Sequence, residues 1–439
     1  MPARMQDLRA FPHGDTHRMQ LPAFVEVEQS LYSKRVADLA AAVCRAWGAA
    51  GCRRRIRRGD RVAITVGSRG IDNLPTIVGL LVDILKKAQA KPFILPAMGS
   101  HGGATAAGQT ALLESLGVTP ASVGAPIRAS MATVQVGKTA GGIPVHAARE
   151  ALNADGLVVV NRVKQHTDFT GDYESGLVKM LAIGAGKRNG AAALHSRRCK
   201  SLREDIPSAA KLLLKRLPML GGIAILENGY HQTAELVGLP PDEIMVGEKA
   251  LLRRARRTAA RLPFRDIDLL VVDWIGKDVS GVGFDTHVIA RRMVWGEPEF
   301  RGSAVGVVAA LDLTPGSHGN ALGLGLADLV TERLLGKVDW SAVQTNVLHT
   351  GFLNRAKRPL AFPNDRDLMR AAFVALGDPD PKRVRIVRIA DTLHPGRAWI
   401  SEGLLKEARQ CPRTKVLGEP AALKFDRAGN LKRLRRRMD

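Results

Sequence analysis

Short apolar runs alternate with longer helical patterns along most of this chain. The runs predicted to be strands are residues 61–66, 92–96, 156–161, 222–226, 268–274, 304–310 and 383–389. The helical patterns fall near residues 72–90, 104–116, 174–183, 208–216, 241–259, 322–335 and 366–376. Continuous apolar strands separated by helices are typical of parallel sheets that helices cover on both faces. The sequence therefore predicts an α/β fold with mainly parallel sheets.

With 439 residues, the chain is long enough for two domains, each with its own hydrophobic core. It contains no apolar run of about 18 residues or more, so no transmembrane helix and no membrane partner are expected. No apolar stretch follows Met1, so no signal peptide is expected. The four cysteines form no C-x-x-C pair, which favours a reducing compartment and a cytoplasmic location. The charged tail after Cys411 is expected to be peripheral.

The chain is strongly basic, with 65 lysines and arginines against 42 acids and a net charge of +23. Two interpretations compete: a face that binds nucleic acid, and a basic surface that favours anionic ligands in general. The cations are dispersed, and aromatic residues make up only 4% of the chain, so stacking platforms for single strands are scarce. The second interpretation is favoured, and nucleic acid is not expected as a partner. A basic nucleic-acid-binding or scaffold protein stays open as an alternative.

The most informative loops follow the predicted strands, because ligands bind beyond the carboxyl ends of parallel strands. These loops are residues 67–73, 98–105, 163–195 and 276–283, and each places glycine beside a charged or imidazole group. The glycines around His101 allow the backbone to approach a ligand, and Ser100 could bind an anion. A capped turn with a structural histidine would explain the same pattern. His166 could act as a general base, or it could simply be solvated.

Lys179 lies in an apolar run, where a buried lysine tends to lose its proton and become a nucleophile. A lysine that extends its amine to solvent from an amphipathic helix is the alternative. His195 could bind a metal, yet no second histidine or cysteine stands at ligand spacing from it. Arg69 could clamp a carboxylate in bidentate fashion, or be one surface arginine among many. Lys277 has the same ambiguity.

Together these loops resemble the nickel-dependent lactate racemase family over roughly residues 62–389. Gly99-Ser100-His101 is similar to the family's glycine–threonine–histidine loop. His166 followed by Ser175-Gly176-Leu177-Val178-Lys179 resembles its histidine followed by a serine–glycine–glycine–x–lysine run. His195 stands at the family spacing after the lysine, and Gly276-Lys277-Asp278 resembles a glycine-rich loop of the family's second domain.

The resemblance implies a nickel-pincer nucleotide, pyridinium-3,5-bisthiocarboxylic acid mononucleotide nickel, bound covalently to Lys179. His195 would be the nickel ligand, and Ser175, Gly99 and Ser100 would contact the cofactor. Sulfur atoms of the cofactor would supply the soft donors that the chain lacks, in a near-planar arrangement that suits nickel. Enzymes that make the cofactor would be needed for maturation, and protein produced without them would lack it.

The resemblance also implies the activity and the domain arrangement. The chain would be an isomerase, a racemase or epimerase of a 2-hydroxy acid, working by reversible hydride transfer. His101 and His166 would be acid/base groups on opposite faces of the substrate carbon, and Arg69 and Lys277 would bind the substrate. The implied fold has a discontinuous first domain of residues 1–90 and 266–439 and a second of residues 91–265, with the active site in the cleft between them.

The chain departs from the family pattern around the substrate. The family's aspartate–histidine–threonine–arginine loop is here Val66-Gly67-Ser68-Arg69, and the arginine–proline after its catalytic histidine is Gly102-Gly103. The loop from His166 to Lys179 is also longer. These differences predict a 2-hydroxy acid other than lactate, larger or more polar. A cofactor-independent two-base racemase built on His101 and His166 is the alternative enzyme.

Overall fold

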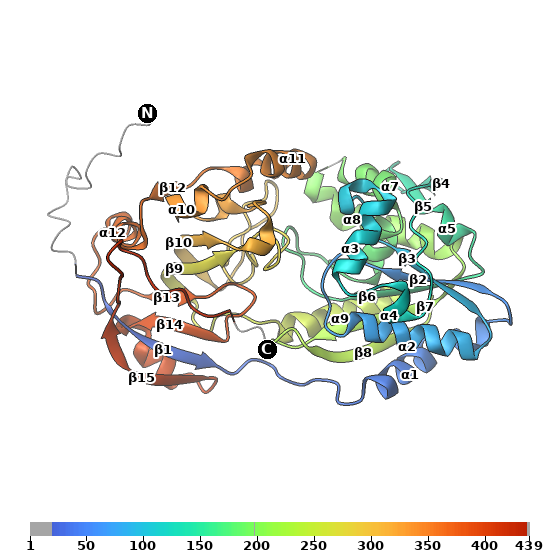
Figure 1. Cartoon of the computed structure of the whole chain (residues 1–439), viewed down its shortest axis with the longest axis horizontal. Helices are drawn as coiled ribbons and strands as arrows, with labels where there is room; N and C mark the ends of the chain where they lie inside the picture. Colours follow the sequence, from blue (N-terminus) through green and yellow to red (C-terminus); the bar gives the residue numbers. More distant parts are fainter. Residues whose placement is uncertain (1–19, 197, 437–439) are drawn as a thin grey trace. The chain divides into compact units, whose positions relative to one another are not determined.

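The structure is a computed structural model that describes residues 20–196 and 198–436. It divides into two compact units, unit 1 with Met1–Leu31 and Ala260–Asp439, and unit 2 with Tyr32–Ala259 (Figure 1). Both units are mixed α/β structures with mainly parallel sheets, which confirms the predicted fold class. The division differs from the predicted one over residues 32–90. They join unit 2 because strand β2 (Arg61–Val66) pairs with strands of that unit on both sides.

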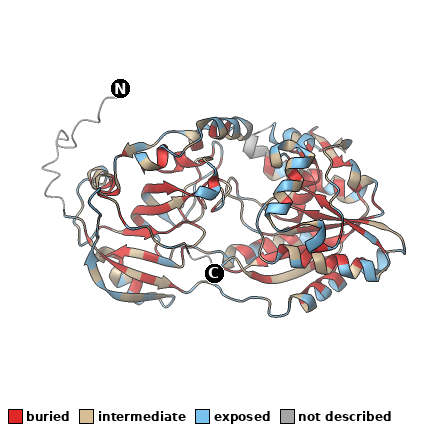
Figure 2. Ribbon diagram, viewed as in Figure 1, coloured by how far each residue is buried: buried red, intermediate tan, exposed pale blue. Residues whose placement is uncertain are grey.

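Unit 2 is built on a five-stranded sheet in the order β3-β2-β6-β7-β8. The first four strands run parallel, and β8 is antiparallel to β7. Besides β2 they are β3 (Lys91–Pro96), β6 (Gly156–Arg162), β7 (Met219–Glu227) and β8 (Thr233–Leu239), and a separate hairpin joins β4 (Thr133–Lys138) to β5 (Pro144–Ala148). The apolar runs predicted as strands form the buried centre of this sheet, shown in red in Figure 2.

Helices cover both faces of this sheet. The longer ones are α1 (Leu39–Ala49), α2 (Leu74–Lys87), α3 (Ala106–Ser115), α7 (Lys187–His195), α8 (Arg198–Arg216) and α9 (Ile244–Thr258). Single turns form α4 (Pro120–Val123), α5 (Arg149–Leu152) and α6 (Leu177–Lys179). Two adjacent glycines of β7 show the layering. A Cβ on Gly221 would lie 3.0 Å from Ala50, just after α1, whereas one on Gly222 would lie 2.6 Å from Leu177 of α6.

Unit 1 contains an eight-stranded sheet in the order β12-β11-β10-β9-β13-β14-β1-β15. The strands β12 (Leu360–Phe362), β11 (Leu329–Thr331), β10 (Ala304–Leu313), β9 (Asp266–Ile275) and β13 (Ile386–Ile389) are parallel. The antiparallel edge consists of β14 (Arg397–Ser401), β1 (Ala23–Gln29) and β15 (Thr414–Ala422). The helices are α10 (Glu332–Leu335), α11 (Trp340–Thr350), α12 (Asp365–Ala375) and α13 (Leu405–Gln410).

Two expectations for unit 1 were wrong. The helix predicted over residues 322–335 is instead a 3-10 turn, the buried strand β11 and the single turn α10. Its apolar residues are buried on a sheet rather than on one helical face. The tail after Cys411 is not peripheral, since β15 completes the sheet and later residues bind buried carboxylates: Arg433 donates to Asp365, and Arg436 to Asp391.

Within residues 20–196 and 198–436, no helix combines the length and the apolar character needed to cross a membrane.

Candidate functional site

The predicted site residues of unit 2 gather at the carboxyl edge of its sheet. Ser68 and Arg69 follow β2, His101 follows β3, and His166 follows β6. These three strands are neighbours and run parallel, so their following loops emerge at the same edge. The sequence rule that ligands bind beyond strand ends therefore led to one cluster of side chains.

The loop after β3 contacts the loop after β2 on one side and the Lys179 segment on the other. The Ser68 hydroxyl hydrogen-bonds the Nδ1 atom of His101. The Gly99 N–H donates to the carbonyl of Gly184 at 3.3 Å. Gly99 has a φ of +61°, and an added Cβ would lie 3.2 Å from Ile183, so only glycine fits here. Ser100 lies exposed beside it.

Two buried polar side chains hold the His101 loop from beneath. Gln109 of α3 donates from Nε2 to the carbonyls of Gly99, at 2.9 Å, and His101, at 3.3 Å. Lys187 in turn donates to Gln109 Oε1 at 3.0 Å, and burial lowers the pKa of this lysine to about 8. Thr105 caps α3 by accepting the Gly108 N–H, as the capped-turn interpretation expected. The loop is thus fixed by α3, whose Gln109 is in turn held by Lys187 at the start of α7.

His166 is fixed at its backbone and at both ring nitrogens. Its N–H donates to Glu174 Oε2 at 2.6 Å, and its ring stacks on Phe169 with centroids 4.5 Å apart. Nδ1 accepts the Asp168 backbone N–H at 3.0 Å, and Nε2 hydrogen-bonds Lys179 Nζ. The ring is thus held with Nε2 against the Lys179 amine, where a proton can pass between the two nitrogens.

Lys179 ends the single turn α6, and a π-helical turn, Met180–Gly184, follows directly. The helix predicted over residues 174–183 therefore begins later and widens. Gly176 is extended, and its neighbour Ser175 forms a backbone bridge with Lys164, which delays the start of the helix. Single π-turns often occur at functional sites because they redirect side chains. The Lys179 side chain is half-buried rather than solvated.

Asp168 couples electrostatically to Arg69 and His195, which brings both into the same cluster. Burial and the positive charge of Lys179 lower the pKa of His195 to about 4, against the opposing effect of Asp168. The side chain of His195 is nevertheless exposed to solvent. Burial and Arg162 likewise lower the pKa of Arg69, which stays protonated in any case.

Lys277 belongs to unit 1 and lies in the loop after β9. Its Nζ donates to the Gly281 carbonyl at 2.8 Å, and its backbone N–H donates to Ser317 Oγ at 3.2 Å. The substrate contact assigned to it stays a prediction. In the part of the chain that the structure describes, no group of three or more histidine, cysteine, aspartate or glutamate residues could hold a metal ion.

The residues that bind the backbone just before Lys179 were not predicted from the sequence. Glu248 of α9 accepts the Val178 N–H at 2.9 Å, and Asn161 Nδ2 donates to the Gly176 carbonyl at 2.9 Å. Glu248 carried a readable signal, since it stands four residues after Ile244 on the apolar face of the predicted helix 241–259. A charged side chain on the buried face of a helix needs a hydrogen-bond or ion-pair partner, because burying it alone costs free energy. Asn161, at the end of a strand, carried none.

Comparison with known proteins adds a family match and two likenesses. A family model described as a domain of unknown function, DUF362, matches residues 66–251, which contain every predicted site residue of unit 2. None of the curated proteins matches the chain in sequence. The lactate racemase apoprotein from Thermoanaerobacterium thermosaccharolyticum is similar in structure, with 13% identity, a TM-score of 0.48, and coverage of 84% of this chain and 89% of that chain.

A structural-genomics protein from Thermotoga maritima is also similar, with 13% identity and a TM-score of 0.45. It covers 64% of this chain and 72% of its own. At these identities and TM-scores the two likenesses carry no argument about activity, which rests on the residues of the site.

Proposed function

We propose that the chain is a racemase or epimerase of a 2-hydroxy acid that works with a nickel-pincer nucleotide attached to Lys179. The observation that supports this most directly is the contact of the Lys179 amine with the His166 imidazole, beside the loop that carries His101. Two imidazoles suit a reaction that handles both enantiomers, because each enantiomer presents its hydroxyl on a different side. An imidazole also exchanges protons readily near neutral pH.

The residues of the site fit the proposed cofactor. The Lys179 amine lies against an imidazole that can take its proton, and a deprotonated lysine acts as a nucleophile. His195 has a pKa of about 4, so its imidazole is neutral at pH 7, and neutral imidazole is the form that binds a metal. These two residues would hold the cofactor. When bound, it supplies a reversible acceptor for the α-hydrogen of the substrate as hydride.

The side chains of the chain would handle the substrate's protons and its carboxylate. Ser68 orients the His101 ring through Nδ1, and Nε2 would exchange a proton with the hydroxyl of one enantiomer. With Lys179 attached to the cofactor, Nε2 of His166 would exchange a proton with the hydroxyl of the other enantiomer. Arg69 would bind the carboxylate through two parallel hydrogen bonds.

Mass spectrometry of protein co-produced with the cofactor-making enzymes tests the proposal. Peptides should show a sulfur-containing adduct at Lys179, and the intact protein should contain nickel. Lys179→Met should remove the adduct, whereas His195→Ala should keep the adduct and lose the nickel. Lys138→Met, at an exposed position of the β4–β5 hairpin, serves as a control and should change neither. Unmodified Lys179 under these conditions would contradict the assignment of Lys179 as the attachment point of the cofactor.

Solvent deuterium distinguishes the proposal from a cofactor-independent two-base racemase. Return of the same hydrogen as hydride leaves the α-position largely unlabelled in D₂O. Abstraction of the α-hydrogen as a proton by His101 or His166 exchanges it with solvent and incorporates the label. Extensive α-labelling during racemisation would favour the cofactor-independent reaction.

A further inference from the structure

Helix α9 delivers a buried carboxyl group to the backbone that presents Lys179. The side chain of Glu248 is completely buried, and its Oε2 accepts the Val178 N–H at 2.9 Å. A Cβ on Gly176 would lie 2.4 Å from the carboxyl carbon of Glu248. The carboxyl group therefore lies directly against the start of α6, where only a glycine leaves room for it.

The strand side of the same turn is held as well. Asn161, at the end of β6, donates from Nδ2 to the Gly176 carbonyl at 2.9 Å. The peptide groups just before Lys179 are thus fixed between β6 and α9. Because α6 is a single turn followed by a π-turn, it has few hydrogen bonds of its own to fix its orientation.

The helix α9 also reaches the partner of Lys179. Arg256 ion-pairs with Glu174 at 2.5 Å and donates to the Gly171 carbonyl at 2.6 Å. Glu174 is the carboxylate that accepts the His166 backbone N–H. One helix therefore supports both members of the Lys179–His166 contact, through Glu248 for the lysine and through the Arg256–Glu174 pair for the histidine.

Glu248 lowers the stability of the fold when it is ionised. Burial raises its pKa from 4.5 to about 7, although the N–H groups of Val178 and Leu177 oppose the rise. Its Oε1 has no hydrogen-bond partner among the described residues. Because folding raises this pKa, the folded protein loses stability as pH rises from 4.5 through 7. Tyr173 also faces this carboxyl, and the Asp172–Lys249 and Glu174–Arg256 pairs lie on the neighbouring loop and helix.

We propose that Glu248 is a positioning residue for Lys179, whose carboxyl group holds the α6 turn so that the lysine amine meets the His166 imidazole. The inference rests on the proposed function, because that function makes Lys179 the attachment point. A carboxyl group placed only for stability would not occupy a buried site with an unpaired oxygen. A carboxyl group that orients a reactive lysine can occupy it at the expense of stability.

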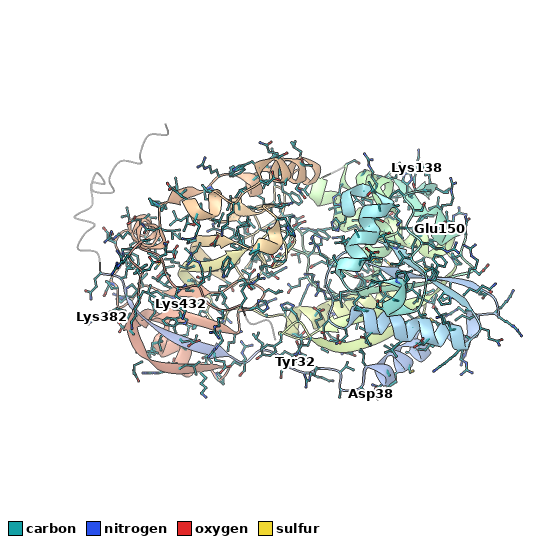
Figure 3. The ribbon with its side chains drawn as sticks, in the orientation of Figure 1. Tyr32, Asp38, Lys138, Glu150, Lys382 and Lys432 are labelled. Atoms are coloured by element: carbon teal, nitrogen blue, oxygen red, sulfur yellow. The ribbon has the colours of Figure 1, made fainter. Side chains whose placement is uncertain are left out.

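Trace labelling of the unconjugated protein with acetic anhydride at about pH 8 tests this proposal. The acetylation rate of Lys179 is measured by mass spectrometry relative to exposed Lys138, which Figure 3 labels. In Glu248→Met, which removes the acceptor of the Val178 N–H, the relative rate should fall about tenfold, whereas in Glu248→Gln an amide oxygen can still accept that N–H and the fall should be smaller. An amine that no longer meets His166 loses the base that can take its proton, and less than about 1% of an ordinary lysine is neutral at this pH. The thermal midpoint should stay or rise, because a buried charge has been removed.

The changes in the acetylation rate of Lys179 and in the thermal midpoint, taken together, distinguish a residue that positions Lys179 from one that only stabilises the fold. A fall in labelling with an unchanged or higher midpoint supports the proposal. An unchanged labelling rate in Glu248→Met, or labelling and midpoint falling together in both Glu248→Gln and Glu248→Met, overturns it. Wild-type Lys179 that labels no faster than Lys138 also counts against it.

The control variant is Glu243→Gln, an exposed acid at the start of the same helix, and it should change neither readout. Because the labelling uses protein without cofactor, it is independent of the test of the proposed function. Failure to find an adduct at Lys179 would refute that function and leave the effect of Glu248 on the amine measurable.

Discussion

Arg69 lies close enough to Arg162 for the two positive charges to interact, and the charge of Arg162 is balanced by an ion pair with Glu227. Burial alone would raise the pKa of Glu227, but Arg162 and His231 together lower it to about 2. A carboxylate with a lowered pKa contributes stability that is complete above about pH 4.5 and is lost as pH falls towards 2. The pair therefore stabilises unit 2 next to the proposed carboxylate clamp.

Replacing Arg162 with methionine should destabilise the protein by about 3 kcal/mol at pH 7, because a buried carboxylate loses its partner. The deficit should shrink as pH falls, because burial without Arg162 raises the pKa of Glu227 in the variant, and below about pH 4.5 the wild-type pair loses its own contribution as well. Urea unfolding at neutral and acidic pH measures both values. Arg254→Met is the matched control, since Arg254 pairs with Glu235 at the surface. It should change the unfolding free energy by less than about 1 kcal/mol, and an equal effect of both variants would contradict the prediction.

The reactive residues of the site could be predicted from their residue types and places in the sequence. Most of the residues that hold them in position could not. His101, His166 and Lys179 follow strands or lie in an apolar run, so their types and places could be read from the sequence. The bond between Ser68 and His101 could not, because it depends on how two loops 33 residues apart curve towards each other. The contact of His166 with Lys179 could not either, since the Asp168 backbone N–H orients the ring by donating to Nδ1.

At the scale of elements, predictability followed the hydrophobic pattern. The parallel strands β2, β3, β6, β7, β9 and β10 are buried on both faces, so their continuous apolar runs identified them. The strands β1 and β15 carry charged residues in alternation and lie at the antiparallel edge, and they were missed. The 322–335 segment shows the opposite error, because its apolar residues were assigned to a helix that does not form.

The packing of α1 on β8 depends on one glycine. A Cβ on Gly238 would lie 1.7 Å from the Ala46 carbonyl oxygen, so the backbones of the strand and the helix are in direct contact. Gly238→Ala should destabilise unit 2 by at least about 2 kcal/mol, because the helix must move away from the strand. Thermal or urea unfolding measures the loss.

Gly48 of α1 gives the matched comparison for that variant. It lies in the helix with nothing within 4 Å of an added Cβ, so Gly48→Ala should stabilise the protein by about 0.5 to 1 kcal/mol. If Gly238→Ala lowers the free energy of unfolding and Gly48→Ala raises it, the backbone contact between α1 and β8 is what requires a glycine at position 238. A stable Gly238→Ala variant would contradict it.

For the whole molecule, the large positive charge is partly internal. In unit 1 the C-terminal arginines bind carboxylates that are completely buried, Arg433 at Asp365 and Arg436 at Asp391. Lys432, labelled in Figure 3, belongs to the same segment, and its carbonyl accepts from Arg388. Sequence reasoning treated this tail as a peripheral charged segment because a run of arginines carries no sign of its distant aspartate partners.

The double variant Arg433→Met/Arg436→Met tests whether these arginines stabilise unit 1. Burial raises the pKa of Asp365 and Asp391, but their hydrogen bonds and cationic neighbours bring both below the ordinary value. Each pair therefore contributes stability above about pH 4 that disappears as pH falls further. At neutral pH the double variant should lose at least about 3 kcal/mol, since two buried carboxylates lose partners.

Hydrogen exchange measured by mass spectrometry locates the effect of that variant. Amides of β13 and α12 should exchange faster, while those of β2 and β6 in unit 2 should keep their wild-type rates, because each unit has its own core. Arg435→Met, at an exposed position between the two arginines, is the control and should leave both units unchanged. If the double variant exchanged like the control, these two arginines would contribute to the net charge of +23 only as surface charges.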